Sequence, residues 1–146
     1  MKQRRMKIEC AKMENVPKTI NVKKIDWILR IAIFGTFLGH GVLAIQLKPS
    51  FLTLMEGMTG ISGPLAENLL VSIGVIDIIT AIFAIVFPFR LLLMWATAWG
   101  FLTAIARPVS GEPVWDFIER GANIGAPLAL LYVRQLPTTL KELFRI

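Results

Sequence analysis

The side chains of this chain that could do chemistry stand inside or beside long apolar runs. If such runs cross a bilayer, an ionisable group near the centre costs at least about 2.5–3.5 kcal/mol on insertion scales, which points to a function or a pairing partner. Counting about 1.5 Å of rise per residue, His40 and Glu119 lie at similar heights, roughly 6 Å off centre, and Asp77 lies near the middle. The candidate ligand-binding residues are Arg30, His40, Glu67, Asp77, Arg107, Asp116, Glu119 and Asn123.

Helical spacing places several of these groups on shared faces. Asp116, Glu119 and Asn123 follow the i, i+3, i+7 pattern of one helix face. A polar stripe of this kind must face protein or water, because hydrocarbon does not solvate it. Arg120 can pair back to Asp116 at i−4.

Two other runs carry polar groups ten residues apart. Arg30 and His40 have this spacing, as do Glu67 and Asp77, and ten residues correspond to about 80° around a helix axis. Both members of each pair can therefore face one interior. The polar groups of three runs can therefore face one axis, and Arg107, at the end of the third run, adds a charged group from the remaining run.

Two interpretations of this polar cluster remain open. In one, the cluster is a pocket for a small molecule, a quinone head group or a proton path, with His40 exchanging protons and Asp77 or Glu119 as the shuttling acid. In the other, Arg107 pairs with Glu119 or Glu67 and Asp116 pairs with Arg120, which only holds the helices in register. A metal site is not expected, because the chain has one His and its carboxylates are spread over separate helices. No phosphate loop, nucleophile elbow or nucleotide fingerprint is present.

The elements that must position these groups are four apolar runs. The chain of 146 residues is 55% hydrophobic and 18% charged, with a mean hydropathy of +0.63. Residues 69–87 contain one charge and residues 91–106 none. Neither segment therefore has the charged, water-exposed face of a helix in a soluble bundle. We predict an all-α integral membrane four-helix bundle (residues 25–135) with spans at about 25–47, 65–87, 90–107 and 114–133.

The charges predict the orientation of this bundle. Residues 1–24 hold eight basic and two acidic residues, and the rest of the chain is neutral overall. By the positive-inside rule, the tail 1–24 and the segment 136–146 are both cytoplasmic, which predicts a multi-pass protein of the bacterial inner (plasma) membrane. A surplus of positive charge confined to a tail does not favour a nucleic-acid partner. The single cysteine, Cys10, excludes a disulfide scaffold within the chain.

Shorter patterns complete the expected fold. Residues 50–56 suggest either a short helix lying in the head groups or an ordinary loop. Pro88, Phe89 and Arg90 predict a tight turn between the second and third spans. Small residues are expected to let the helices pack closely. Gly35 and Gly39 form a G-x-x-x-G pattern. The glycines expected to pack are Gly35, Gly39, Gly41, Gly74, Gly121 and Gly125.

Several of these motifs resemble those of the DoxX and DoxX-like family of small four-helix membrane proteins. The similar features are Arg30, FGTFLGHG at 34–41, Glu67, ARP at 106–108 and WDFIERGAN at 115–123. The likeness covers about residues 25–135. Many members carry a Lys four residues after the position of His40, where this chain has Ala44. The resemblance implies Arg30, His40, Glu67, Arg107, Glu119 and Asn123 as candidate binding residues.

The resemblance also implies a class of function. The family is named for a subunit of a thiosulfate:quinone oxidoreductase, and other members look like accessory proteins of membrane redox complexes. We therefore expect a small-molecule-binding accessory subunit of a membrane redox system, with quinone as the candidate cofactor and no catalysis by this chain alone. Alternatives are a non-enzymatic scaffold or assembly factor and, third, a proton path or transporter. The expected partners are the lipid bilayer and a redox subunit or a second copy of the chain.

Overall fold

The computed structural model describes residues 21–145, and in that range all regular secondary structure is helical, without strands. Most of the predicted basic tail, residues 1–20, lies outside the described part. The elements are α2 (Val22–Ile45), α3 (Pro49–Thr59), α4 (Gly63–Val86), α5 (Arg90–Val109), α6 (Val114–Glu119), α7 (Gly121–Val133) and a short 3₁₀ helix, η1 (Leu140–Phe144).

Three of these helices are long and apolar enough to cross a membrane: α2, α4 and α5. They correspond to the first three predicted spans. Along α4, large apolar side chains stay about half exposed in the isolated chain, among them Ile76, Ile79 and Ile82. Such a continuous apolar face is solvated poorly by water and well by hydrocarbon. The class of protein that the fold defines is therefore an all-helical chain with helices suited to a membrane.

The fourth predicted span is not one continuous helix. Its helix is interrupted at Arg120, where φ is −84° and ψ is 7°, so that α6 and α7 are separate segments. At this interruption the backbone N–H of Arg120 donates to the carbonyl of Phe117, and that of Asn123 donates to the carbonyl of Arg120. These are tight three-residue turns rather than α-helical bonds. Gly121, a poor helix former, follows directly. The predicted fourth span at about 114–133 therefore corresponds to two helical segments, α6 and α7.

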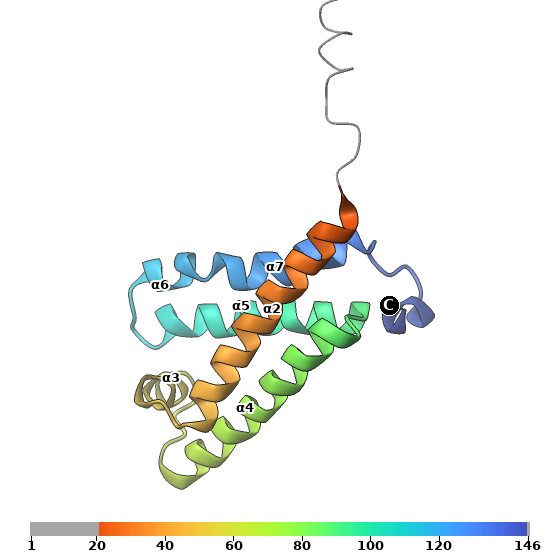
Figure 1. The fold of residues 1–146 in the computed structure, drawn as a ribbon. Coiled ribbons are helices and arrows are strands. Elements are labelled where there is room, and N and C mark those ends of the chain that lie inside the picture. Colours follow the sequence, from red (N-terminus) through yellow and green to blue (C-terminus); the bar gives the residue numbers. More distant parts are fainter. Residues whose placement is uncertain (1–20, 146) are drawn as a thin grey trace, which may run out of the picture.

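The helices form two hairpins that cross each other (Figure 1). α2 packs mainly against α4, and α5 packs mainly against α7, while α2 also packs on α7. The turn at residues 87–89 joins the hairpins, with the Phe89 N–H donating to the carbonyl of Phe87 over 2.8 Å. A tight turn is therefore present, one residue earlier than predicted, because Arg90 already begins α5. We call this the turn end of the molecule and the opposite end, which carries α3 and α6, the cavity end.

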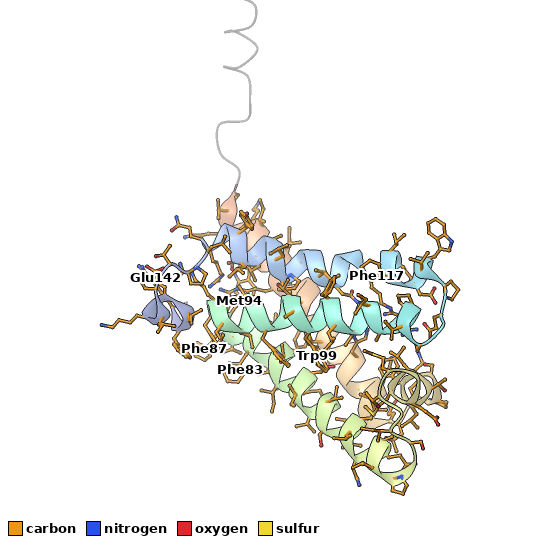
Figure 2. The ribbon with its side chains drawn as sticks, turned by 180° about the vertical axis from the view of Figure 1, so that it is seen from behind. Phe83, Phe87, Met94, Trp99, Phe117 and Glu142 are labelled. Carbon is orange, nitrogen blue, oxygen red and sulfur yellow. The ribbon has the colours of Figure 1, made fainter. Side chains whose placement is uncertain are left out.

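The apolar core lies in the half of the molecule towards the turn end. Ile33 and Phe37 of α2, Leu93 of α5 and Leu130 of α7 are buried there, and Ala81 of α4 fills the remaining space. Figure 2 shows the same arrangement from behind, with Phe83 on α4 and Phe87 directly after it. Small alanines between larger side chains allow the two hairpins to converge at this end. Towards the other end the hairpins separate.

Residues 50–56 fall within α3, so they form a helix rather than an ordinary loop, while the place of this helix in the head groups stays a prediction. α3 begins at Pro49, which suits the first helical turn because its missing N–H has no helical partner there. The helix ends at Gly60, whose φ of 71° is left-handed and favours glycine. α3 contacts both α4 and α5, so it bridges the two hairpins where they separate.

Only part of the expected glycine packing occurs within the chain. Gly41 and Gly74 bring α2 and α4 into backbone contact, as predicted. At the other glycines expected to pack, a Cβ atom would meet no neighbouring atom within 4 Å, and these are Gly35, Gly39, Gly121 and Gly125. The G-x-x-x-G pattern in α2 is therefore not used between the described helices of this chain.

Candidate functional site

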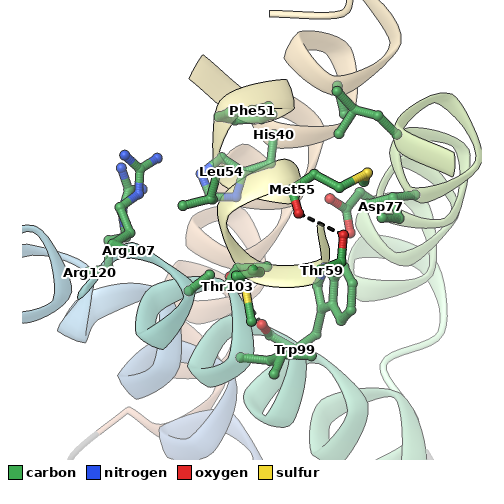
Figure 3. Close-up of a pocket in the computed structure, with 16 residues that line it drawn as sticks. His40, Phe51, Leu54, Met55, Thr59, Asp77, Trp99, Thr103, Arg107 and Arg120 are labelled. Carbon is green, nitrogen blue, oxygen red and sulfur yellow. Dashed lines mark hydrogen bonds between the residues drawn. The ribbon is translucent and has the colours of Figure 1, made fainter. Parts of the chain in front are cut away.

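A cavity of about 230 Å³ opens at the cavity end, between α2, α3, α4 and α5 (Figure 3). α3 closes one side with four side chains at the i, i+3, i+4, i+7 spacing of one helix face: Phe51, Leu54, Met55 and Met58. The opposite walls are mostly apolar as well, and Trp99 of α5 lies among them. The separation of the two hairpins thus creates an apolar chamber that α3 covers.

Asp77 contributes a carboxyl group to the wall of this chamber. It lies on α4, is only 4% exposed, and its Oδ1 atom has no hydrogen-bond partner. The indole of Trp99 lies beside the carboxyl. Most buried polar atoms in proteins are hydrogen-bonded, so an unpartnered carboxyl oxygen at a cavity wall is an exception that calls for an explanation. A bound molecule with a hydrogen-bond donor would supply the missing partner.

His40 reaches the same cavity from α2. Its imidazole packs edge-on against the ring of Phe51, with the ring centroids 6.0 Å apart and an interplanar angle of 88°. An imidazole can both donate and accept a hydrogen bond, and it can exchange a proton near neutral pH. The structure therefore gives the cavity two groups of different chemistry, Asp77 and His40.

Two arginines add positive charge to the cavity lining, Arg107 of α5 and Arg120 at the α6–α7 interruption. Arg107 pairs through Nη1 with Glu112 Oε2 over 2.6 Å. The pairing of Arg107 with Glu119 or Glu67, which belonged to one of the two interpretations left open, is not formed, because the partner comes from the loop that follows α5. The Nε atoms of both arginines are buried without a hydrogen-bond partner.

The predicted pair of Asp116 with Arg120 is also not formed. The ion pairs of the described residues join Asp26 to Arg30, Asp26 to Arg134, and Arg107 to Glu112. Interruption of the helix at Arg120 explains this, because the i−4 relationship to Asp116 depends on a continuous α-helix.

An open groove of about 300 Å³ lies behind the cavity wall. It is lined by Glu119 and Asn123 together with Gly35 and Gly39 of α2. His40 and Arg120 line both this groove and the cavity. These two side chains therefore stand between the cavity and the groove.

Arg30 belongs to a different part of the molecule. Its Nε lies 2.7 Å from Asp26 Oδ2, and its Nη1 donates to the carbonyl of Ile85. The other oxygen of Asp26 is 2.8 Å from Arg134 Nη2. This network lies at the turn end, so the expectation that Arg30 and His40 share one interior site was wrong.

The eight predicted binding residues are thus divided among several places. The cavity brings together His40, Asp77 and Arg107, and the groove brings together His40, Glu119 and Asn123. Three of the eight line neither space: Arg30, the exposed Glu67 near the start of α4, and the half-buried Asp116 of α6.

Sequence reasoning missed several residues of these sites, some of which carried a signal in the sequence and some of which did not. The apolar face of α3 could have been found from its helical spacing, and the Asp26–Arg30 pair could have been found from its i, i+4 spacing. Glu112 and Arg134 lie in connecting segments and carry no such signal.

Comparison with known proteins identifies no relative of this chain. The chain matches no protein-family model, no curated protein and no solved structure. Among residues 21–145, no group of three or more His, Cys, Asp or Glu side chains is arranged to hold a metal ion. The chemistry of the site must therefore be argued from the cavity itself.

Proposed function

We propose that this chain is a small multi-pass protein of the bacterial inner membrane that binds a small molecule for a membrane redox system. The proposed ligand is the head group of a quinone or of its quinol, held in the cavity beside Asp77. In this proposal α6 and α7 together form the fourth crossing, and both termini are cytoplasmic. The observation that carries the proposal is the buried, unpartnered Asp77 carboxyl oxygen in an otherwise largely apolar chamber.

The size of the cavity suits such a head group. An apolar protein cavity of about 150 Å³ is large enough to bind benzene. The cavity here, of about 230 Å³, leaves room for a substituted ring. A planar aromatic ligand would also find an aromatic neighbour in Trp99, which lines the cavity.

The polar groups suit a ring with oxygen substituents. An ionised Asp77 accepts a hydrogen bond from a quinol hydroxyl, and His40 donates to a quinone carbonyl or accepts from a hydroxyl. Arg107 and Arg120 add positive charge to the lining, which favours an anionic form of the ligand. We assign electron transfer to a partner subunit, so that this chain binds and orients the ligand.

The resemblance to the DoxX family supports the same class of ligand. Three motifs that carry the resemblance contribute to the cavity: His40 lies in FGTFLGHG, Arg107 lies in ARP and Arg120 lies in WDFIERGAN. Asp77 lies outside the motifs on which the resemblance rests. The cavity therefore supports the proposal independently of the resemblance.

The proposal is tested by titrating the purified full-length protein in detergent, under anaerobic reducing conditions, with menadiol, the quinol of a small naphthoquinone, whose hydroxyls can donate to Asp77. Binding beside Trp99 is expected to quench its fluorescence, and Trp99→Phe identifies that part of the signal among the four tryptophans of the chain. Asp77→Asn and His40→Leu should each weaken binding by about ten-fold, the effect of losing one hydrogen bond in a desolvated site.

Glu67→Gln is the matched control, because Glu67 lies on the same helix and is exposed. Its affinity for menadiol should equal that of the unmodified protein. Equal affinities for the Asp77→Asn variant and the control would contradict the proposal. Absence of any saturable quenching would instead favour the scaffold or assembly-factor alternative.

A further inference from the structure

A second concave site lies at the turn end, away from the cavity. It is a crevice of about 460 Å³ between the start of α2 and the end of α7. The residues that line it are Val22, Lys23, Asp26, Trp27, Arg30, Val133 and Arg134. This turn-end crevice shares no residue with the cavity beside Asp77.

The crevice carries more positive than negative charge. Three of its side chains are cationic, Lys23, Arg30 and Arg134, and one is anionic, Asp26. Both oxygens of Asp26 are engaged by the arginines, at 2.7 Å from Arg30 and 2.8 Å from Arg134. The aspartate thus fixes the two guanidinium groups in place while leaving the crevice with an excess of two positive charges. Such an arrangement favours an anion.

Apolar surface adjoins these charges. Trp27 is 51% exposed, and the guanidinium of Arg30 lies 4.8 Å from the centroid of its ring. Further along α2, Ile28 and Ile31 are 64% and 59% exposed. Exposed tryptophan beside cationic side chains and next to an apolar helix face is typical of the boundary between head groups and hydrocarbon. A ligand for this surface should therefore have an anionic head and apolar chains.

We propose that the turn-end crevice binds the phosphodiester head group of an anionic phospholipid, with its acyl chains along the exposed face of α2. Lys23, Arg30 and Arg134 provide the positive charge for the phosphate, and Trp27 packs against the glycerol region. Free phosphate shares the head-group chemistry, but it would make no use of the apolar surface of Trp27, Ile28 and Ile31. This inference does not depend on the quinone proposal, because the two sites have no residue in common.

The test exchanges the full-length protein into mixed micelles of detergent with equal amounts of phosphatidylglycerol and phosphatidylcholine. The protein is then re-purified, and the retained phospholipid is quantified by mass spectrometry. The unmodified protein should retain phosphatidylglycerol in excess. Lys23→Gln should lower that excess by about five-fold, because one Lys or Arg near an anionic surface contributes a factor of this order.

Lys24→Gln is the matched control. Lys24 is the next residue of the same exposed helical turn and carries the same charge, but it does not line the crevice. It should leave the excess unchanged. Equal losses in the Lys23 and Lys24 variants would overturn the proposal, since they would show attraction to the general basic charge of this end of the chain.

Two further measurements distinguish binding of a whole lipid from binding of free phosphate, and a third checks that each variant is folded. Trp27→Ala should also reduce retained phosphatidylglycerol, and unchanged retention in that variant would count against a lipid. Inorganic phosphate at matched ionic strength should not displace the lipid more than chloride does. Displacement by phosphate alone would identify the crevice as a free-phosphate site and would overturn the lipid assignment. Helical circular dichroism of each variant confirms that it is folded.

Discussion

Gly41 and Gly74 face each other where α2 crosses α4, and neither position has room for a side chain. A Cβ atom on Gly41 would lie 2.8 Å from the carbonyl oxygen of Gly74, and one on Gly74 would lie 2.7 Å from that of Gly41. Real contacts are never this short for a Cβ, so the two backbones are in direct contact. His40 precedes Gly41, and Asp77 follows Gly74 by three residues. The crossing therefore helps to set the positions of both polar groups at the cavity.

The first prediction follows from this contact. Gly41→Ala and Gly74→Ala should each lower the free energy of unfolding by about 1–3 kcal/mol, the usual cost of overpacking, although alanine is the better helix former. The measurement is denaturation of the purified protein in detergent. Gly39→Ala is the control, because a Cβ on Gly39 meets nothing within 4 Å. A Gly39→Ala variant as unstable as the other two would contradict the argument.

The second prediction compares two aspartates in opposite situations. Asp77→Leu removes a buried oxygen that has no partner, and the adjacent cavity has space for the new side chain. It should raise the free energy of unfolding by about 1–3 kcal/mol. Asp26→Leu removes the shared partner of Arg30 and Arg134. It should lower the free energy of unfolding by about 3 kcal/mol, because both guanidinium groups are largely buried.

The same denaturation measurement checks both aspartate variants. Opposite signs are the expected result. A loss of stability in Asp77→Leu comparable to that in Asp26→Leu would mean that Asp77 holds the fold together. In that case the explanation of its missing partner by a ligand would have to be abandoned.

The length of the apolar runs predicted α2, α4 and α5. Backbone N–H and C=O groups in hydrocarbon must be hydrogen-bonded within the protein, and a long helix pairs all of them within one segment. The composition of the site was harder to predict. Arg30 and His40 face directions about 80° apart around α2, but ten residues also separate them by about 15 Å along the helix axis. A shared face therefore did not mean a shared site. Arg30 instead binds Asp26, one helical turn away.

The cavity could not be predicted from single-helix patterns. It arises because the two hairpins converge on small core residues such as Ala81 and Ala84 and then separate towards α3. The angle between hairpins depends on packing between residues distant in the sequence. Partners from connecting segments, such as Glu112 for Arg107, are equally invisible to helical periodicity.

The third prediction concerns the number of membrane crossings. In a Cys10→Ser background, single cysteines replace Lys24, Ser110 or Thr139, and intact cells and inverted vesicles are treated with a membrane-impermeant maleimide. If α6 and α7 form a fourth crossing, Lys24→Cys and Thr139→Cys react only in inverted vesicles, and Ser110→Cys reacts only in intact cells. Reaction of Thr139→Cys in intact cells alone would leave three crossings and would contradict the proposed topology.

The fourth prediction concerns Arg90, a buried residue that ties the C-terminal segment to the turn end. Its Nε donates to the carbonyl of Gln135 over 2.7 Å, its Nη2 to that of Arg134 over 2.6 Å, and its Nη1 to that of Glu142 over 3.2 Å. Arg90→Gln cannot reach all three carbonyls. We expect amide hydrogen exchange over residues 135–145 to become at least about ten-fold faster, the effect of losing one net hydrogen bond, while exchange in α2 stays unchanged. Unchanged exchange in 135–145 would show that other contacts hold this segment.

The fifth prediction is a pH dependence at the same segment. The backbone N–H of Thr138 donates to Glu142 Oε2 over 2.8 Å, and the Thr138 hydroxyl donates to the same oxygen over 3.1 Å. These bonds, the backbone one foremost, hold the pKa of Glu142 below its usual value. A carboxyl with a lowered pKa in the folded state stabilises this turn fully above its ordinary pKa, and the contribution is lost as the pH falls through the lowered value.

The amide proton shift of Thr138, followed by NMR during acidification, should therefore titrate with a midpoint below that of an unperturbed glutamate. Thr138→Ala removes only the hydroxyl donor and should move the midpoint part of the way back up, whereas Glu142→Gln should abolish the titration. A midpoint at the ordinary glutamate value in the unmodified protein would show that these two bonds do not form in solution.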